Sequence, residues 1–218
     1  MYPLITQSSV FDAVILCDGD FPKSAIPLAI LRNASYVCCC DGATAQCVAH
    51  GITPQAIVGD GDSLTEELKK RFADRLHLVS EQEDNDQTKA TRFCMEQGMK
   101  RIAYIGSTGR REDHTLGNIA LLARYYAVFL LEVKMITDYG YFVATSGRQR
   151  FESFPRQQFS IYNIGGSSRL EGKGLKWSPY AYKELWQGTL NEALDGEVEL
   201  DADNAYLVYA TFEAKGLW

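Results

Sequence analysis

Two aspartates near residue 60 follow a short apolar run and could bind a cation. The run Ala56–Val58 ends at Gly59, and Asp60 and Asp62 follow with only Gly61 between them. Two carboxylates this close repel each other, and one is driven toward protonation unless a cation lies beside them. Asp and Gly are also common turn residues, so a solvated turn is the alternative. The segment alone predicts either a metal site or a plain turn.

The same kind of segment follows three other predicted strands. The acidic or Gly-rich segments after the four strands are Asp41–Ala43, Gly59–Ser63, Ser80–Asp86 and Gly106–His114. In open parallel sheets, ligands bind beyond the carboxyl ends of the strands, so we expect these segments to share one edge. Hard oxygen ligands suit Mg²⁺, which also binds substrate phosphates. The recurrence therefore predicts a magnesium site at this edge.

A glycine-rich turn followed by arginines predicts contacts with phosphate. Backbone N–H groups of Gly106–Gly109 could approach a phosphate where the turn leads into a helix. Arg111 could neutralise charge that develops on a transferring phosphoryl group. Together with the acidic edge, these residues indicate metal-assisted handling of a nucleotide phosphate chain.

Several of these residues have a structural alternative. Asp86 and Asp113 each stand where a predicted helix begins, and either could serve as its N-cap. Glu81 and Asp84 are interpreted as parts of a solvated loop. His114 is interpreted first as a structural histidine.

The elements that must position these residues form an α/β pattern over residues 1–146. Apolar runs without polar alternation predict buried strands at 13–17, 36–40, 56–58, 76–79, 101–105 and 128–136. Helical spacing between them predicts helices at about 23–32, 44–50, 65–75, 87–97 and 113–125. We expect a mostly parallel, Rossmann-like sheet flanked by helices.

The pattern changes after Thr137, where helical periodicity disappears. Short alternating stretches separated by Gly, Ser, Asn and Asp predict strands at 141–145, 158–163, 184–190, 197–200 and 205–212. Residues 147–218 are predicted to form an all-β sandwich domain, with the boundary near residues 146–149.

Composition narrows the classes of function. The net charge of −6 argues against sequence-independent nucleic-acid binding, and no segment has the length of apolar sequence that a membrane helix needs. Six cysteines without a CxxC pair predict neither zinc nor disulfides, and we expect a cytoplasmic protein. The chain lacks a P-loop, a G-x-G-x-x-G opening after the first strand and a G-x-S-x-G turn.

In order and spacing, the motifs resemble those of thiamin pyrophosphokinases. The matching segments are Asp41–Ala43, Gly59–Ser63, Asn85–Ala90, Gly109–Asn118, Gly174–Trp177 and Gly188–Asn191. The resemblance runs from about residue 15 to the end of the chain. It implies transfer of pyrophosphate from ATP to the hydroxyl of thiamin, which gives thiamin diphosphate and AMP. It also implies a homodimer with its active site in a cleft between subunits.

The resemblance assigns roles to residues of the first domain, which it identifies as the ATP- and Mg²⁺-binding catalytic domain. Asp60, Asp62 and Asp86 are expected to hold Mg²⁺ against the ATP phosphates, and Asp41 to shape the nucleotide or metal site. Arg111 is expected to stabilise the transferring group, and Asp113 to orient the thiamin hydroxyl or accept its proton. Ser63, Gly109 and His114 complete the expected substrate contacts.

The second domain is expected to bind thiamin, a flat cation that favours an aromatic face. Trp177 is the expected platform, and a tryptophan in the core of the sandwich is the alternative. Asn191, Ser160 and Gln82 are weaker candidates for the pocket. Glu83, Asn85 and Leu190 depart from the family pattern.

Two other functions remain open at this point. An Asp-x-Asp segment after a strand is compatible with a Mg²⁺-dependent phosphohydrolase or another small-molecule kinase. The departures at Glu83, Asn85 and Leu190 are compatible with a non-catalytic protein that binds thiamin or a nucleotide.

Overall fold

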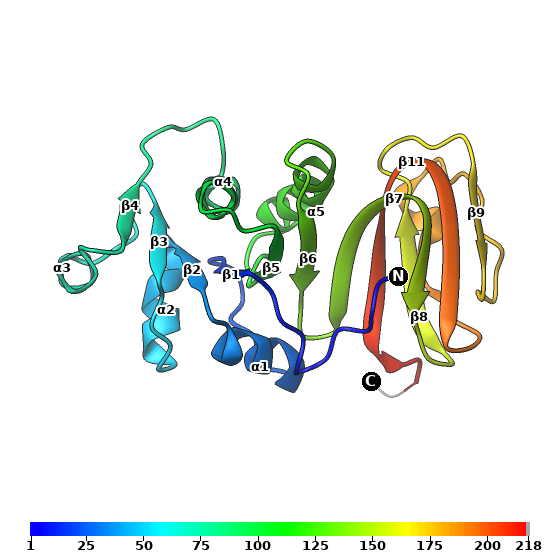
Figure 1. The fold of residues 1–218 in the computed structure, drawn as a ribbon, viewed down its shortest axis with the longest axis horizontal. Coiled ribbons are helices and arrows are strands. Elements are labelled where there is room, and N and C mark those ends of the chain that lie inside the picture. The colour runs from blue at the N-terminus through cyan, green and yellow to red at the C-terminus, as the bar shows by residue number, and fades with distance from the viewer. Residues whose placement is uncertain (217–218) are drawn as a thin grey trace. The chain divides into compact units, whose positions relative to one another are not determined.

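The computed structural model describes residues 1–216 and divides by its contacts into two compact units (Figure 1). The α/β unit comprises Gln7–Leu121 and Leu131–Asp138. The β unit comprises Met1–Thr6, Leu122–Leu130 and the chain from Tyr139 onward. No helix within residues 1–216 has the length and apolar character needed to cross a bilayer.

The α/β unit is built on a parallel sheet with the strand order β6-β5-β1-β2-β3-β4. Its strands are β1 (Ala13–Leu16), β2 (Val37–Cys40), β3 (Ala56–Gly59), β4 (Leu76–Leu78), β5 (Arg101–Ile105) and β6 (Glu132–Ile136). The central strands β1, β2 and β3 are buried along their whole length, as their uninterrupted apolar sequences require. The expected parallel α/β fold is confirmed.

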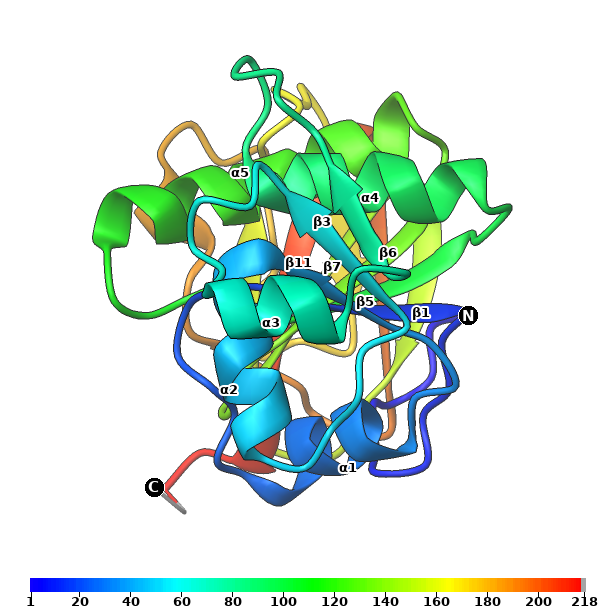
Figure 2. The same cartoon turned by 90° about the vertical axis from the view of Figure 1, so that its left-hand side faces the viewer.

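Helices cover both faces of this sheet, with α4 and α5 on one side and α1 and α2 on the other (Figure 2). Their bounds are α1 (Ala25–Asn33), α2 (Thr44–Ala49), α3 (Glu66–Arg71), α4 (Asp86–Glu96) and α5 (Glu112–Ala127), with a short 3₁₀ turn η1 at Asp41–Ala43. The N-cap of α4 is Asn85, whose Oδ1 accepts a hydrogen bond from the Thr88 N–H at 3.0 Å. Asp86 is therefore the first residue of the helix and does not serve as its cap.

The strand order reverses at β1, and this places a crevice beside that strand. From β1 the chain proceeds outward through β2, β3 and β4, and then returns to place β5 on the other side of β1. Ligands of open α/β sheets bind at such a reversal, beyond the carboxyl ends of the strands. Here the loops after β1 and β5 meet through hydrogen bonds from Gly19 N–H to Gly106 O (2.7 Å) and from Asp20 N–H to Thr108 O (2.9 Å).

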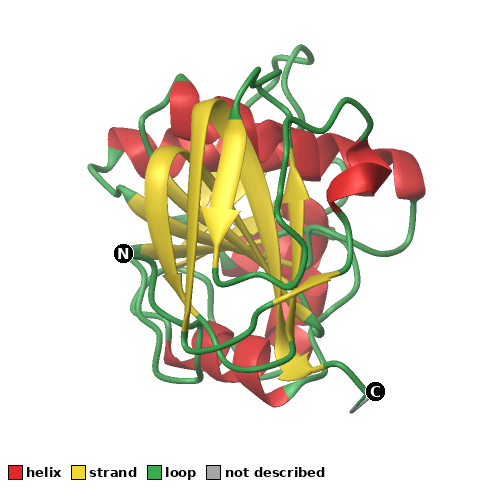
Figure 3. Ribbon diagram, turned by 90° about the vertical axis from the view of Figure 1, so that its right-hand side faces the viewer, coloured by secondary structure: helices red, strands yellow, loops and turns green. Residues whose placement is uncertain are grey.

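The named strands of the β unit pair in antiparallel fashion (Figure 3). Strands β10, β8, β11 and β7 lie in that order, and β9 pairs with the first part of β11. Their bounds are β7 (Gly140–Glu152), β8 (Gln157–Tyr162), β9 (Leu170–Lys173), β10 (Asn191–Glu192) and β11 (Glu197–Ala214). The expected all-β, antiparallel character of this half is confirmed.

Several expected strands differ from the structure. The strand expected at 184–190 is a 3₁₀ helix, η2 (Leu185–Gly188), because Glu184 and Gln187 form a reciprocal capping box. The strands expected at 197–200 and 205–212 are one strand, β11, because a register shift between Ala202 and Tyr206 absorbs the polar interruption. The strand expected at 128–136 begins only at Glu132.

The predicted boundary between residues 146 and 147 falls inside β7, which continues through it. The contact-based division instead separates Asp138 from Tyr139. Residues 217–218 of the predicted second domain lie outside the described residues.

Candidate active site

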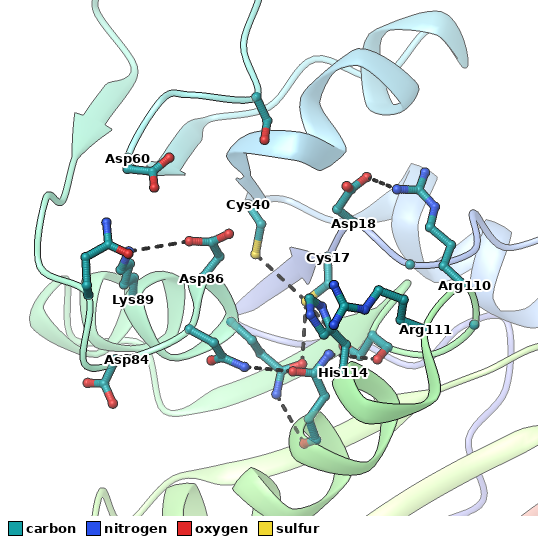
Figure 4. A pocket seen from close by; sticks show the side chains of 18 of the residues that line it. Cys17, Asp18, Cys40, Asp60, Asp84, Asp86, Lys89, Arg110, Arg111 and His114 are labelled. Carbon is teal, nitrogen blue, oxygen red and sulfur yellow. Dashed lines mark hydrogen bonds and ion pairs between the residues drawn. The ribbon is translucent and has the colours of Figure 1, made fainter.

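A polar cavity of about 680 Å³ lies at the carboxyl edge of the parallel sheet (Figure 4). The loops after β1, β3, β4 and β5 and the first turns of α4 and α5 supply its walls. Seven of the residues expected at the site line this cavity: Asp60, Ser63, Gln82, Asp86, Gly109, Arg111 and His114. The sheet thus brings together side chains that lie more than fifty positions apart in the sequence.

Asp41 lies outside the lining and supports the loop that carries Asp60. Its side chain is buried, and its two carboxylate oxygens accept hydrogen bonds from Gly42 N–H (2.7 Å) and Gly61 N–H (3.0 Å). A Cβ at Gly59 would lie 2.7 Å from the Asp41 carboxyl carbon, so only glycine allows this approach. The pKa of Asp41 is raised, mainly by burial and secondly by the negative charge of Asp86.

The three carboxylates expected to hold Mg²⁺ do not assemble into one ligand set. The Asp62 N–H donates to Asp60 Oδ1 at 3.1 Å, and this turn leaves the Asp62 side chain exposed and outside the lining. Among residues 1–216, no group of three or more His, Cys, Asp and Glu side chains is arranged to hold a metal ion. The metal role expected of Asp62 stays a prediction, and this turn geometry does not support it.

Two of the three expected carboxylates, Asp60 and Asp86, line the cavity, and their chemistry fits a magnesium ion. Mg²⁺ in nucleotide sites commonly takes one or two carboxylates together with phosphate oxygens and water. Burial is the largest cause that raises the pKa of Asp86, and the negative charges of Asp60 and Asp18 raise it further. A bound cation would relieve this repulsion.

Lys89 is a functional candidate that the sequence analysis did not identify. It lies one turn after Asp86 on α4, its side chain is buried, and its Nζ lies 3.6 Å from Asp86 Oδ1. The signal was present in the Asn85–Ala90 motif, where Lys89 follows Asp86 by about one helical turn. A buried ammonium at the cavity wall can contact a phosphate oxygen.

The two neighbouring arginines of the Gly-rich turn have different partners, and Figure 4 shows the pair of Arg110 with Asp18. Arg110 adopts a left-handed backbone conformation (φ 58°) and pairs with Asp18 at 2.7 Å. Arg111 pairs with Asp113, and its Nε lies 3.1 Å from Asp113 Oδ1. Neither Asp18 nor Arg110 was expected at the site, although both line the cavity.

The pair with Arg111 changes the chemistry available to Asp113. Hydrogen bonding from Arg111, followed by that from the His114 N–H, lowers the pKa of Asp113 to about 2. A carboxylate with this pKa is a weak base at neutral pH. The geometry therefore favours Asp113 as the residue that orients Arg111, rather than as the acceptor of a substrate proton.

Asn118 and two thiols form the inner wall of the cavity. Asn118 Nδ2 donates to Ser107 O at 2.8 Å, and its Oδ1 accepts from Asn85 Nδ2 at 2.9 Å, which ties the Gly-rich turn to α4. Cys17 and Cys40 also line the cavity, with their sulfur atoms 3.9 Å apart. Neither cysteine was expected at the site.

Trp177 in the β unit is half exposed, so the alternative of a core tryptophan is wrong. Its backbone is held by the buried Asn191 side chain, which accepts from Trp177 N–H (3.1 Å) and donates to Trp177 O (2.7 Å). Lys176 Nζ lies 4.7 Å from the centroid of the indole ring and pairs with Glu192. Asn191 thus positions the indole through its backbone.

Ser160 acts in a similar way on the residue before Asn191. Its Oγ accepts a hydrogen bond from Leu190 N–H at 3.2 Å. Leu190 is exposed and has a φ of 63°, a conformation that a leucine rarely adopts without support. Ser160 and Asn191 therefore shape the chain around Trp177.

Replacing Asn191 with alanine is expected to lower the free energy of unfolding by about 1–3 kcal/mol, because the backbone groups of Trp177 lose their partners. Asn191→Asp, which keeps the acceptor and loses the donor, should have an intermediate effect. Urea unfolding of the two variants and the parent measures both values. Equal stability of all three proteins would contradict this role of Asn191.

A parallel α/β unit with a cavity lined by acidic residues and arginines at its strand reversal is typical of proteins that act on phosphate-bearing ligands. The model of the thiamin pyrophosphokinase catalytic domain matches residues 28–133, and that of the thiamin pyrophosphokinase substrate-binding domain matches residues 140–209. Together the two models cover most of the chain, which belongs to the thiamin pyrophosphokinase family of enzymes. The predicted family is confirmed.

Individual relatives agree with this assignment. The thiamine pyrophosphokinase of Bacillus subtilis is 37% identical over 86 residues, which span 38% of this chain and 40% of that protein. Its crystal structure matches with a TM-score of 0.75 at 18% identity and covers 92% of this chain and 100% of that one. The Candida albicans thiamin pyrophosphokinase matches with a TM-score of 0.77 at 14% identity, over 97% and 94% of the two chains. These structural matches show the shared fold.

Proposed function

We propose that this chain transfers the terminal pyrophosphate of ATP to the hydroxyl of thiamin and releases AMP. The observation that carries the proposal is the cavity itself. It places Asp60, Asp86, Lys89 and Arg111 together inside the segment that matches the catalytic domain of the family. This arrangement supports binding of a polyphosphate chain and a divalent cation.

Asp60 and Asp86 are the residues that would hold Mg²⁺. The ion, when bound, neutralises phosphate charge and lowers the barrier to attack at phosphorus. Asp41 keeps the Asp60 loop in place through its hydrogen bonds to Gly42 and Gly61. Lys89 supplies a second, buried positive charge beside Asp86.

The proposed reaction joins the thiamin oxygen to the β-phosphorus and breaks the bond from that phosphorus to the oxygen that leaves with AMP. The proton of the thiamin hydroxyl is released to solvent. Arg111, with its guanidinium fixed by Asp113, stabilises the charge on the transferring group. Ser63, Gln82, Gly109 and His114 line the same cavity and contact the substrates. Positioning and electrostatics carry the catalysis, because little covalent chemistry is required of the protein.

The thiamin site is proposed to use Trp177 as its aromatic platform. Replacing Trp177 with alanine is expected to raise the KM for thiamin about tenfold, because a cation loses its contact with an aromatic face. The KM for ATP should remain unchanged. Trp177→Phe should recover part of the lost affinity, and steady-state kinetics with each substrate varied in turn measures both effects. An equal rise in both KM values would contradict the assignment.

The proposed protein is a cytoplasmic homodimer with its active site in a cleft between subunits. Six free, buried cysteines are compatible with a reducing compartment. The β unit exposes several large apolar side chains that a partner subunit could cover: Trp177, Tyr180, Leu185, Trp186 and Leu190. If two subunits form each site, refolding a mixture of Asp86→Asn and Trp177→Ala chains should give mixed dimers in which one site carries neither substitution. At low thiamin concentration their activity should exceed the sum of the activities of the two variants.

A product assay tests the function. The pure protein is incubated with ATP, Mg²⁺ and thiamin, and the nucleotides and thiamin phosphates are separated. The proposal expects AMP and thiamin diphosphate in equal amounts. ADP with thiamin monophosphate would indicate a simple kinase, and thiamin-independent phosphate release would indicate a phosphohydrolase. Binding of thiamin without any product would indicate a non-catalytic binding protein.

A further inference from the structure

A second cavity, of about 420 Å³, lies beside the polar cavity in the α/β unit. The loop after β1 and the end of α2 supply most of its walls. The two cavities share Gly19 and Arg110 as lining residues, so they meet at the junction of the loops after β1 and β5. A ligand that crosses this junction can occupy both.

The second cavity contains an aromatic pair that the first one lacks. The rings of Phe21 and His50 stack with centroids 3.8 Å apart and an interplanar angle of 11°. His50 Nδ1 lies 2.9 Å from Gln46 O, and because a carbonyl oxygen can only accept, Nδ1 carries the hydrogen in this contact. The neutral ring then keeps Nε2 as an acceptor. The pair offers a flat surface with a hydrogen-bond acceptor at its edge.

At the junction between the cavities, the backbones of the loops after β1 and β5 pack closely. A Cβ at Gly19 would lie 2.3 Å from Thr108 O, so a side chain cannot be added there without moving the loops. A Cβ at Gly109 would lie 2.2 Å from the Asp20 carboxylate, which therefore packs directly against the Gly-rich turn. Asp20 also lines the second cavity, where a carboxylate could accept hydrogen bonds from hydroxyl groups.

We propose that the second cavity binds the base and sugar of the nucleotide, with the base on the Phe21–His50 pair. The phosphate chain then passes over Gly19 and Arg110 into the polar cavity, where Lys89 and Arg111 lie. This assignment rests on the proposed use of a nucleoside triphosphate. Its support is chemical: aromatic surface in one cavity, cationic side chains and carboxylates in the other, and a shared junction between them.

The test compares binding of ATP with binding of inorganic tripolyphosphate, which lacks the base and sugar. Calorimetric titrations are made with the full chain and Mg²⁺, without thiamin. Phe21→Ala is expected to raise the Kd for ATP about tenfold, the usual effect of losing one base–aromatic stack. The Kd for tripolyphosphate should stay within twofold. Phe11→Ala, in a separate cavity of the same unit, serves as the matched control and should change neither value.

A second pair of variants keeps the test decisive if Phe21→Ala unfolds. His50→Ala should weaken ATP binding, and His50→Phe, which preserves an aromatic ring, should restore most of it. Equal weakening of ATP and tripolyphosphate, or no change in either, would overturn the assignment. If the variants weaken only the binding of thiamin, the second cavity binds thiamin and not the nucleotide base.

These titrations do not depend on turnover. If the protein binds ATP through Phe21 but makes no thiamin diphosphate, the result supports the base subsite and contradicts only the proposed reaction.

Discussion

Replacing Asp86 with asparagine is expected to lower kcat roughly a thousandfold while the protein stays folded. Asparagine keeps the size of the side chain but removes the charge that would hold a cation. The raised pKa of Asp86 shows that burial and repulsion outweigh the attraction of Lys89 in the metal-free fold. Loss of this charge should therefore leave the melting temperature of the metal-free protein at pH 7 unchanged or slightly higher.

The pH dependence of the metal-free protein follows from the same shift. A carboxylate whose pKa is higher in the folded than in the unfolded chain stabilises the fold when protonated, and this contribution is lost as pH rises through the folded pKa. The Asp86→Asn variant has no carboxyl group that titrates at this position, so its stability should not fall in this way as the pH rises. Thermal melts of parent and variant across the acidic range, in a chelator, should show two curves that diverge as the pH rises above 3.8, the ordinary pKa of an aspartate side chain.

Matched variants at the neighbouring aspartates separate the roles of the carboxylates. Asp60→Asn should reduce kcat in the same way as Asp86→Asn, because both side chains line the cavity. Asp62→Asn should have little effect, because that side chain is exposed and outside the lining. If Asp62→Asn were as inactive as Asp86→Asn, the loop would have to rearrange on ligand binding and bring Asp62 into the site.

Replacing Arg111 with alanine is expected to lower kcat roughly a hundredfold to a thousandfold, because the transferring group loses its stabilising charge. Both partners of the Arg111–Asp113 pair are more than half exposed, so the pair contributes little to stability. The variant should therefore fold normally. Single-turnover kinetics, in which product release does not limit the rate, measures the effect on chemistry.

Two further variants locate the source of that effect. Arg111→Lys should recover only part of the rate, because an ammonium cannot reproduce the planar, bidentate contact of a guanidinium. Asp113→Asn should lower the rate less than Arg111→Ala if Asp113 only orients the arginine. A larger loss in Asp113→Asn, with a changed pH profile, would support proton acceptance by Asp113 instead.

The parallel sheet was predictable because its strands are buried on both faces and carry continuous apolar sequence, as in Ala13–Leu16 and Val37–Cys40. The β unit was less predictable. Segment 184–190 has the alternation of a strand, but the capping box of Glu184 and Gln187 turns it into a 3₁₀ helix. In this segment, local side-chain hydrogen bonds determine the backbone conformation, and the alternating hydrophobic pattern does not.

The site was predictable to the extent that its residues follow strand ends. Asp60, Asp86 and Arg111 were located by that rule and by their motifs. Lys89 and Arg110 were not, because a lysine in a helix and an arginine in a turn are ordinary surface residues until burial and partners are known. The Phe21–His50 pair joins residues 29 positions apart, and its stacking has no signature in the sequence.

The backbone hydrogen bonds between Gly19 and Gly106 and between Asp20 and Thr108 have an evolutionary consequence. They join two loops that are distant in sequence into a single structural module with no room for a side chain at residue 19. Substitutions in the two loops cannot be accepted independently. A relative that carries a side chain at this position must also have remodelled the turn after β5, so the two segments should diverge together.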